Sequence, residues 1–126
     1  MRPDPEKDAM KTLIIINDPP YGTERGWNAL RLATNLVIKH EDVELSVFLL
    51  GDAASIAKSG QQTPNGYYNL ERMVANVLRK SAQVLVCGTC MDARGLTQEE
   101  LVDGARRSTM DELTSLTYEA DKVLVF

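Results

Sequence analysis

Residues 84–95, with the sequence VLVCGTCMDARG, join a short apolar run to a glycine-containing segment that carries both cysteines of the chain. Three other apolar runs resemble its first half: TLIII at 12–16, VELSVFLL at 43–50 and KVLVF at 122–126. All of these runs are rich in branched aliphatic side chains and are bounded by Gly, Asp or Asn. This pattern is typical of strands buried in a parallel sheet.

Segments with helical periodicity separate the apolar runs. The clearest one follows Asn69, a residue type that favours helix N-caps. Its apolar stripe consists of Leu70, Met73, Val74, Val77 and Leu78. A second stripe consists of Trp27, Leu30, Ala33, Leu36 and Val37. Ser108 with Asp111 predicts a capping box for a third helix, and Thr97 with Glu100 predicts one for a fourth. A weaker helix is expected over 52–58.

The alternation of strands and helices predicts an α/β fold, a three-layer α/β/α sandwich around a mostly parallel sheet of five or fewer strands. A length of 126 residues corresponds to one domain. We expect a single α/β domain over residues 11–126. Residues 1–10 are polar and contain proline, so we expect a frayed or disordered tail there.

Composition narrows the classes of function. The chain has 18 acidic and 14 basic residues, a formal net charge of -4, and no basic run, which argues against nucleic acid as a partner. No apolar run has the length of a membrane helix. The amino-terminal residues also lack the apolar segment of an export signal. We therefore expect a cytoplasmic protein whose two cysteines stay reduced.

Ligands of parallel α/β sheets bind at the carboxyl ends of the strands. Here those ends lead into three stretches, residues 17–22, 51–52 and 87–95. The candidate ligand-binding residues in them are Tyr21, Gly22, Asp52, Thr89 and Gly95. The usual glycine fingerprints of nucleotide sites are absent from the sequence, so we expect no nucleotide cofactor.

The two thiols are the candidate catalytic groups. Cys87 closes an apolar strand, and Cys90 lies in the segment that follows. Arg94 and the start of the helix expected at Thr97 both favour thiolate over thiol, whereas Asp92 opposes it. At least one thiol is therefore a candidate nucleophile, with Arg94 as its stabilising cation. The alternative is that Cys87 is simply a buried strand residue.

A Cys-x-x-Cys pair fits three kinds of chemistry. A thioredoxin-like redox site has its first cysteine at the start of a long helix, and the helix expected here begins only near Thr97. A zinc site needs four ligands, and His40 is the only histidine, so we expect no metal within one subunit. Sulfur transfer through a persulfide needs one reachable, activated thiol.

Several short motifs, taken in order, resemble those of the DsrE/DsrF-like sulfur-relay family, and most closely its YchN-like branch. The resemblance covers nearly all of residues 11–126. Its landmarks are Pro20-Tyr21-Gly22, Asn28-x-Leu30-Arg31-Leu32-Ala33, Phe48-Leu49 to Ala53, Gly66-Tyr67, Cys87-x-x-Cys90-x-Asp92-x-Arg94-Gly95 and the terminal segment 121–126.

The resemblance implies a cytoplasmic homo-oligomer, a hexamer or trimer, without a cofactor. Cys87 matches the family's acceptor cysteine because Arg94 and Gly95 follow at the same distance. In the sulfur carriers this cysteine takes a persulfide sulfur from a donor protein and passes it to an acceptor protein. Cys90 has no counterpart in those carriers but is typical of the YchN-like branch. This departure from the carriers places a second thiol near Cys87, where it is able to resolve a Cys87 persulfide as a disulfide and release sulfide.

Our leading hypothesis is a sulfur-relay protein with Cys87 as acceptor, Arg94 as thiolate stabiliser and Cys90 as resolving thiol. Two alternatives remain open. One is an oligomeric ligand-binding or assembly module that is not an enzyme and whose cysteines are structural. The other is a redox protein that cycles a Cys87–Cys90 disulfide.

Overall fold

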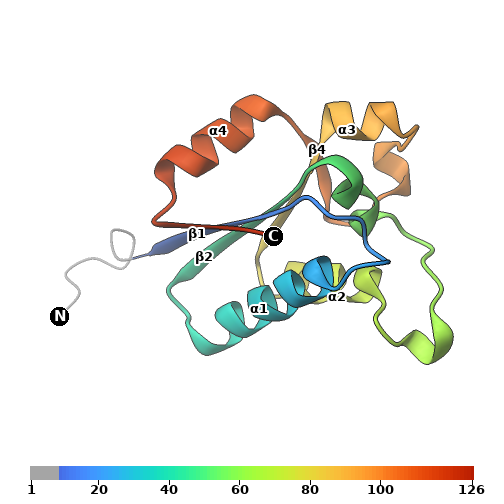
Figure 1. The fold of residues 1–126 in the computed structure, drawn as a ribbon. Helices are drawn as coiled ribbons and strands as arrows, with labels where there is room; N and C mark the ends of the chain where they lie inside the picture. The colour runs from blue at the N-terminus through green and yellow to red at the C-terminus, as the bar shows by residue number, and fades with distance from the viewer. Residues whose placement is uncertain (1–8) are drawn as a thin grey trace.

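A five-stranded sheet forms the centre of the computed structural model, which describes residues 9–126. The strands are β1 (Met10–Ile16), β2 (Val43–Leu49), β3 (Gln83–Cys87), β4 (Arg106–Ser108) and β5 (Lys122–Val125). Their spatial order is β4-β3-β2-β1-β5, and every neighbouring pair is parallel (Figure 1). All four apolar runs of the sequence form strands, so the predicted sheet is confirmed.

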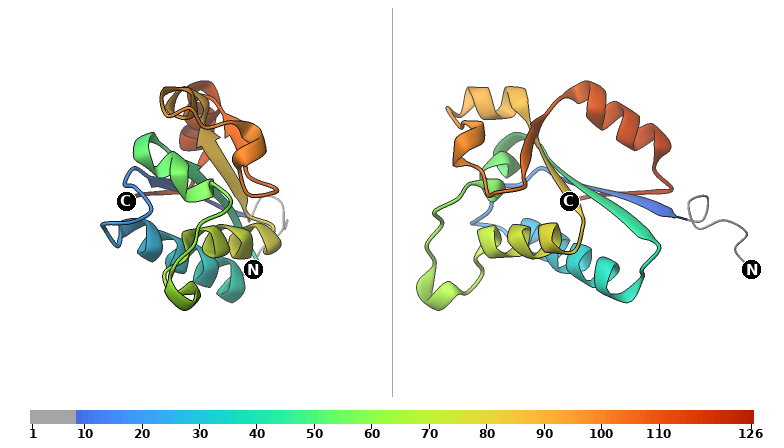
Figure 2. Two further views of the ribbon diagram at one scale, coloured as in Figure 1. Left: turned by 90° about the vertical axis from the view of Figure 1, so that its right-hand side faces the viewer. Right: turned by 180° about the vertical axis from the view of Figure 1, so that it is seen from behind.

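Helices cover both faces of the sheet. The α-helices are α1 (Arg25–Lys39), α2 (Leu70–Arg79), α3 (Gly88–Ala93) and α4 (Met110–Glu119). Three short 3-10 segments, η1 (Gly51–Ala57), η2 (Pro64–Gly66) and η3 (Gln98–Glu100), lie in the connections. The helices α1 and α2 pack side by side on one face, and α4 lies on the other (Figures 1 and 2). The predicted three-layer sandwich is therefore confirmed.

Alternate residues along the strands pack into two separate apolar clusters, one on each face of the sheet. In β1, Ile14 and Ile16 join the large cluster under α1 and α2, whereas Leu13 joins the small cluster under α4. All three side chains are almost completely buried. Burial on both faces explains why the strands have continuous apolar sequences rather than alternating ones.

The start of the domain differs slightly from the prediction. Met10 already belongs to β1, and its amide donates a hydrogen bond to the Asp42 carbonyl at 2.7 Å. The rest of the tail predicted over residues 1–10 falls mainly on residues 1–8, which lie outside the described residues.

The end of the domain contains a strand that the sequence did not predict. Residues 106–108 form β4 at the sheet edge, so Ser108 is a strand residue and Thr109 is the N-cap of α4. The Thr109 hydroxyl accepts from the Glu112 amide at 3.1 Å. Hydrogen bonds from Arg106 and from Ser108 lower the pKa of Glu112 to about 2. The capping box predicted for Ser108 and Asp111 was thus wrong by one position.

The largest correction concerns the segment after Cys87. The helix predicted to begin at Thr97 is only the 3-10 segment η3, although the predicted capping box of Thr97 and Glu100 is present. A different helix, α3, begins at Gly88, directly after β3. The weak helix expected over 52–58 is likewise the 3-10 segment η1.

In the part of the chain that the structure describes, no helix combines the length and the apolar character needed to cross a membrane.

Replacing Asn69 by Ala tests the predicted cap of α2. The Asn69 side chain accepts from the Arg72 amide at 3.1 Å and donates to the Gln61 carbonyl at 3.1 Å. Because an N-cap contributes about 1 kcal/mol, Asn69→Ala should lower the free energy of unfolding in urea by about that amount or more. Asn76→Ala, the same change inside α2, should leave it nearly unchanged; equal effects would contradict the capping role.

Candidate functional site: a cysteine pair at the carboxyl edge of the sheet

Both cysteines lie where β3 ends. Cys87 is the last residue of β3 and also the N-cap of α3, and Cys90 lies inside α3. The start of η1, which follows β2, packs against α3. The site therefore sits at the carboxyl edge of the parallel sheet, as the sequence predicted.

The Cys87 sulfur is almost buried, with 4% of the residue exposed, and lies in the small apolar cluster with Phe48 and Leu85. It still has polar partners. The Cys90 amide donates a hydrogen bond to it at 3.3 Å, and the Thr89 hydroxyl lies 3.3 Å away. The sulfur thus faces apolar side chains on one side and the polar first turn of α3 on the other.

The Cys90 sulfur is partly exposed and has a different backbone partner. The amide of Gly51, at the start of η1, donates a hydrogen bond to it at 3.1 Å. This contact joins the segment after β2 to the helix after β3. Gly51 was not among the candidate residues, because its role depends on the backbone amide and not on a side chain.

The surroundings set the two thiols apart in acidity. Burial raises the pKa of Cys87, but hydrogen bonds from the Cys90 thiol, from the Thr89 hydroxyl and from both backbone amides outweigh it, so the pKa falls below its ordinary value. Burial and the hydrogen bond to Cys87 raise the pKa of Cys90. Of the two thiols, Cys87 is therefore the one whose thiolate form its surroundings favour.

The predicted stabilising cation, Arg94, lies beside Cys90. Its guanidinium donates to the Asp52 carboxylate at 2.8 and 3.0 Å and to the Cys90 carbonyl at 3.0 Å. Asp52, a candidate ligand-binding residue, is the carboxylate that fixes Arg94. The charge of Arg94 lowers the pKa of Cys90, against the larger effects that raise it.

A second arginine, Arg107 in β4, also reaches this edge. It donates to both carboxylate oxygens of Asp92 at 2.7 and 2.9 Å. That pair lowers the pKa of Asp92 and raises the pKa of Arg107. Sequence analysis missed Arg107 because it follows Cys87 by twenty positions and joins the site only through the pairing of β3 with β4.

The remaining candidate residues have varied positions. Thr89, which contacts the Cys87 sulfur through its hydroxyl, is an exposed residue. Gly95 has a φ of +65°, a conformation that glycine adopts easily, and its amide donates to the Asp92 carbonyl at 3.2 Å. Gly95 therefore terminates the helix that carries Cys90.

Tyr21 and Gly22 belong to a separate hollow. The Tyr21 hydroxyl hydrogen-bonds to Gln61 and accepts from the Leu70 amide at 3.3 Å. Gly22, with a φ of +92°, helps to line the hollow. The hollow has a volume of about 360 Å³, and its wall includes Trp27 and Tyr68, whose ring centroids are 4.6 Å apart. Tyr21 thus holds the 58–69 connection against α2.

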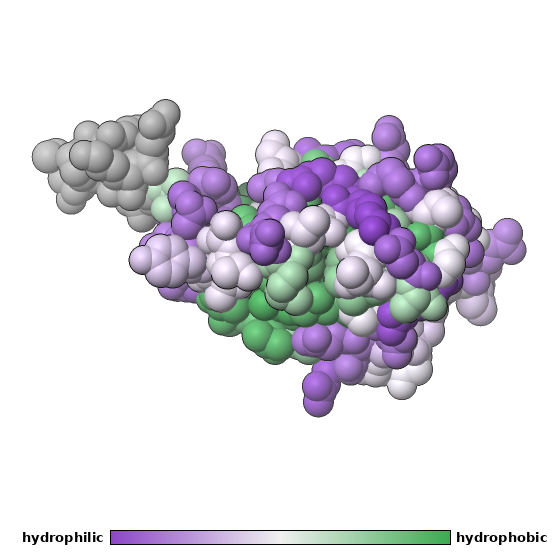
Figure 3. Space-filling view, turned by 90° about the horizontal axis from the view of Figure 1, so that it is seen from above, coloured by the Kyte–Doolittle hydropathy of each residue, from purple (hydrophilic) through white to green (hydrophobic). Residues whose placement is uncertain are grey.

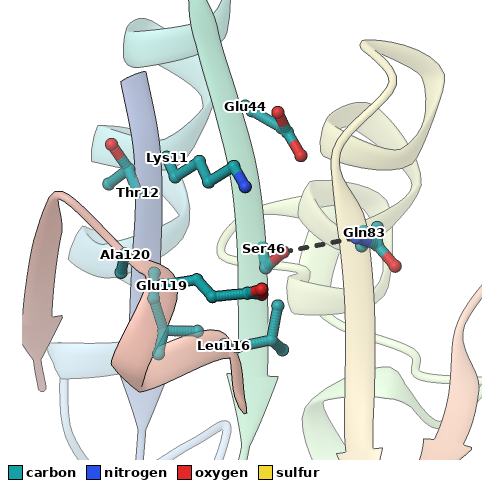
Figure 4. Close-up of a pocket in the computed structure, with 9 residues that line it drawn as sticks. Lys11, Thr12, Glu44, Ser46, Gln83, Leu116, Glu119 and Ala120 are labelled. Carbon is teal, nitrogen blue, oxygen red and sulfur yellow. Dashed lines mark hydrogen bonds between the residues drawn. The ribbon is translucent and has the colours of Figure 1, made fainter. Parts of the chain in front are cut away.

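A small polar cavity lies at the opposite edge of the sheet (Figure 4). Its volume is about 60 Å³, and Lys11 and Glu119 extend along it. Ser46 and Gln83, joined by a hydrogen bond of 3.4 Å, form part of its wall. Lys11 and Gln83 lie near the amino-terminal ends of β1 and β3, and Glu119 ends α4, so the cavity is far from the carboxyl ends of the strands where parallel sheets bind ligands.

Among residues 9–126, no three or more His, Cys, Asp or Glu side chains are grouped so that they would hold a metal ion.

These features define a small α/β protein with a dithiol at the carboxyl edge of a parallel sheet. The chain belongs to the DsrE/DsrF-like family, whose model matches residues 10–126. It is 38% identical over 116 residues to the protein YchN of Escherichia coli K12, covering 92% of this chain and 98% of YchN. An uncharacterised protein of Methanocaldococcus jannaschii is also 38% identical over 117 residues, covering 93% of this chain and all of that protein.

Solved structures agree with this assignment. The crystal structure of YchN from Escherichia coli superposes with a TM-score of 0.88 at 38% identity, covering 93% of this chain and 99% of that one. A protein of unknown function from Methanobacterium thermoautotrophicum, at 13% identity, shares the fold with a TM-score of 0.76, covering 93% of this chain and 99% of that one. The predicted YchN-like branch and the predicted fold are confirmed.

Removing the Thr89 hydroxyl tests the hydrogen bonding of Cys87. Thr89→Val keeps the shape of the side chain but cannot bond to the thiolate, so the pKa of Cys87 should rise by roughly half to one unit. The ultraviolet absorbance of the thiolate, followed against pH in a Cys90→Ser background, measures it. Thr97→Val, the same change at η3, should leave the curve in place. Equal curves for Thr89→Val and the parent would contradict the assignment.

Proposed function

We propose that this protein binds and relays sulfur as a persulfide on Cys87. The observation that carries the proposal is the set of hydrogen bonds that the Cys87 sulfur accepts from the first turn of α3, including the Cys90 amide at 3.3 Å. These donors stabilise negative charge on sulfur, and the thiolate is the nucleophile in such reactions. Membership of the DsrE/DsrF-like family supports the same chemistry.

In the first step, the Cys87 thiolate attacks the outer sulfur of a donor persulfide. A new sulfur–sulfur bond forms on Cys87, the sulfur–sulfur bond of the donor breaks, and the donor leaves as a thiolate. No net oxidation occurs, since one persulfide replaces another. Because Cys87 is only 4% exposed, this step favours a small donor or one whose binding moves the residues that cover the sulfur.

The second step has two outcomes. An acceptor thiolate takes the outer sulfur and regenerates the Cys87 thiolate, which completes a relay. Alternatively, Cys90 loses its proton and attacks the Cys87 sulfur. The Cys87–Cys90 disulfide then forms, and the outer sulfur leaves as sulfide with the electron pair of the broken bond. A dithiol reductant is needed to restore the pair in this second case.

A sulfur-loading experiment tests the proposal. The protein is incubated with a cysteine desulfurase and cysteine, and its intact mass is measured under non-reducing conditions. We expect wild type and Cys90→Ser to gain one sulfur, and Cys87→Ser to gain none. Cys90→Ser should hold the sulfur longer, because the resolving thiol is missing.

The same experiment separates the alternatives. If neither wild type nor Cys90→Ser gains sulfur, the proposed relay is wrong. The two cysteines lie within the first turn of α3, where the Cys90 amide donates to the Cys87 sulfur at 3.3 Å, and this closeness favours a dithiol redox protein as a second candidate. In that case mild oxidation alone should remove the mass of two hydrogens from wild type, and thioredoxin should restore it.

We also propose that the protein acts as a homo-oligomer. The edge strand β5 leaves Val123 and Val125 exposed, 39% and 66%, next to the half-buried Ile15 of β1. Figure 3 shows apolar surface gathered along this side of the molecule. An apolar edge strand of this kind favours pairing with a further copy of the chain.

Light scattering after size-exclusion chromatography checks this proposal. Wild type should elute with the mass of a trimer or hexamer. Val125→Lys places a charge on the exposed edge and should shift the mass towards the monomer. Ile38→Lys changes another exposed aliphatic residue, in α1, and should leave the mass unchanged. A monomeric wild type would contradict the proposal.

A further inference from the structure

We propose that Arg107, anchored by Asp92 and seated against Gly88, is the positioning residue that presents positive charge to the Cys87 sulfur, while Arg94 serves Cys90. The inference deepens the proposed function, because it assumes that Cys87 is the reacting sulfur. It divides the two arginines of this edge between the two thiols.

The backbone after Cys87 leaves room for this guanidinium. A Cβ atom on Gly88 would lie 2.8 Å from Nε of Arg107 and 2.9 Å from its Cζ. It would also lie 2.9 Å from the Ser108 carbonyl oxygen, which belongs to the backbone and cannot yield easily. The Arg107 side chain therefore packs directly on the residue that follows Cys87, and only glycine permits that approach.

Asp92 fixes the orientation of Arg107. Its two oxygens accept from the two terminal nitrogens at 2.7 and 2.9 Å, the two-point geometry that arginine forms with carboxylates. Asp92 lies in α3, and Arg107 pairs in register with Val86 of β3. The guanidinium is thus held between the helix and the sheet edge, beside the residue where β3 passes into α3.

Arg94 is held by other partners and does not pack against the residue that follows Cys87, as Arg107 does. Two of its nitrogens are engaged by Asp52, and the third donates to the Cys90 carbonyl at 3.0 Å. Its charge therefore lies on the Cys90 side of α3. The negative charge of the Cys87 thiolate, in turn, adds to the effects that raise the pKa of Arg107.

Other ionisable groups lie on the elements that pack around Cys87, and the experiment must control for them. They are Cys90 and Asp92 of α3, Arg94 at the C-cap of α3, Asp52 of η1, Arg107 of β4 and Glu112 of α4. Glu112 is paired with Arg106 at 2.6 Å. The neighbours from the remaining layers are apolar: Leu13, Phe48, Leu85 and Leu113.

A positive charge at this place stabilises the anions that form on the Cys87 sulfur. Both the Cys87 thiolate before transfer and the persulfide anion after it carry negative charge at the end of β3. A guanidinium held beside that point favours both over their protonated forms. Its loss should therefore move the titration of the thiol itself, which a merely structural residue would not do.

The decisive comparison uses two variants that differ only at Arg107, both in a Cys90→Ser background. Asp92→Asn removes the carboxylate and keeps the guanidinium, whereas Asp92→Asn/Arg107→Gln removes both. Thiolate absorbance against pH should show the pKa of Cys87 higher in the second by roughly half to one unit. Arg107→Lys in the otherwise unchanged background keeps the positive charge but loses the two-point pair with Asp92, so the pKa of Cys87 should rise less than in Arg107→Gln.

The neighbouring ion pair supplies the matched control. Glu112→Gln and Glu112→Gln/Arg106→Gln should titrate alike, because Arg106 is directed to α4. Far-ultraviolet circular dichroism checks that each variant is folded. If the double variant at Asp92 and Arg107 fails to fold, Arg107→Lys against Arg107→Gln gives the same comparison.

Two results would overturn the assignment of Arg107. One is an unchanged pKa of Cys87 on loss of Arg107, and the other is a larger rise on loss of Arg94. Neither depends on sulfur loading. A shifted titration with no sulfur gain would remove the relay and keep Arg107 as the partner of Cys87. Sulfur gain with no shift would keep the relay and remove Arg107.

Discussion

One residue ends a strand and begins a helix at this site, and the rest of the arrangement depends on it. Cys87 closes β3 and caps α3, so the strand passes into the helix with no loop between them. Its sulfur must therefore lie at the first amides of the helix, where hydrogen bonds compensate for burial among apolar side chains. The acidity of the thiol follows from this backbone path.

Two ion pairs hold the short helix from opposite sides. Arg94 with Asp52 joins α3 to η1, and Arg107 with Asp92 joins it to β4. All four side chains are at least one-third exposed, so each pair contributes little to stability. Their main effect is orientation: a six-residue helix, too short to be stable alone, keeps its place over the sheet edge.

The sequence predicted the elements that have a strong periodic signal and missed those that depend on pairing. The apolar runs were sufficient to predict four strands, and the apolar stripe after Asn69 was sufficient to predict α2. Helix α3 begins with a glycine and has only six residues, so no periodic apolar pattern in the sequence indicates it. β4 contains two arginines in three residues and forms only because β3 lies beside it. The strand order likewise brings Arg107 to Cys87, and no spacing in the sequence encodes that order.

The aromatic contact near the amino-terminal end of α1 gives the molecule a built-in optical probe. Trp27 is the only tryptophan of the chain, and its ring lies 4.6 Å from that of Tyr68. Tyr68 belongs to the connection that Gln61 and Tyr21 hold in place. The intrinsic fluorescence of this protein therefore reports first on the detachment of that connection. Its emission is thus a local signal of the contact between α1 and the 58–69 connection.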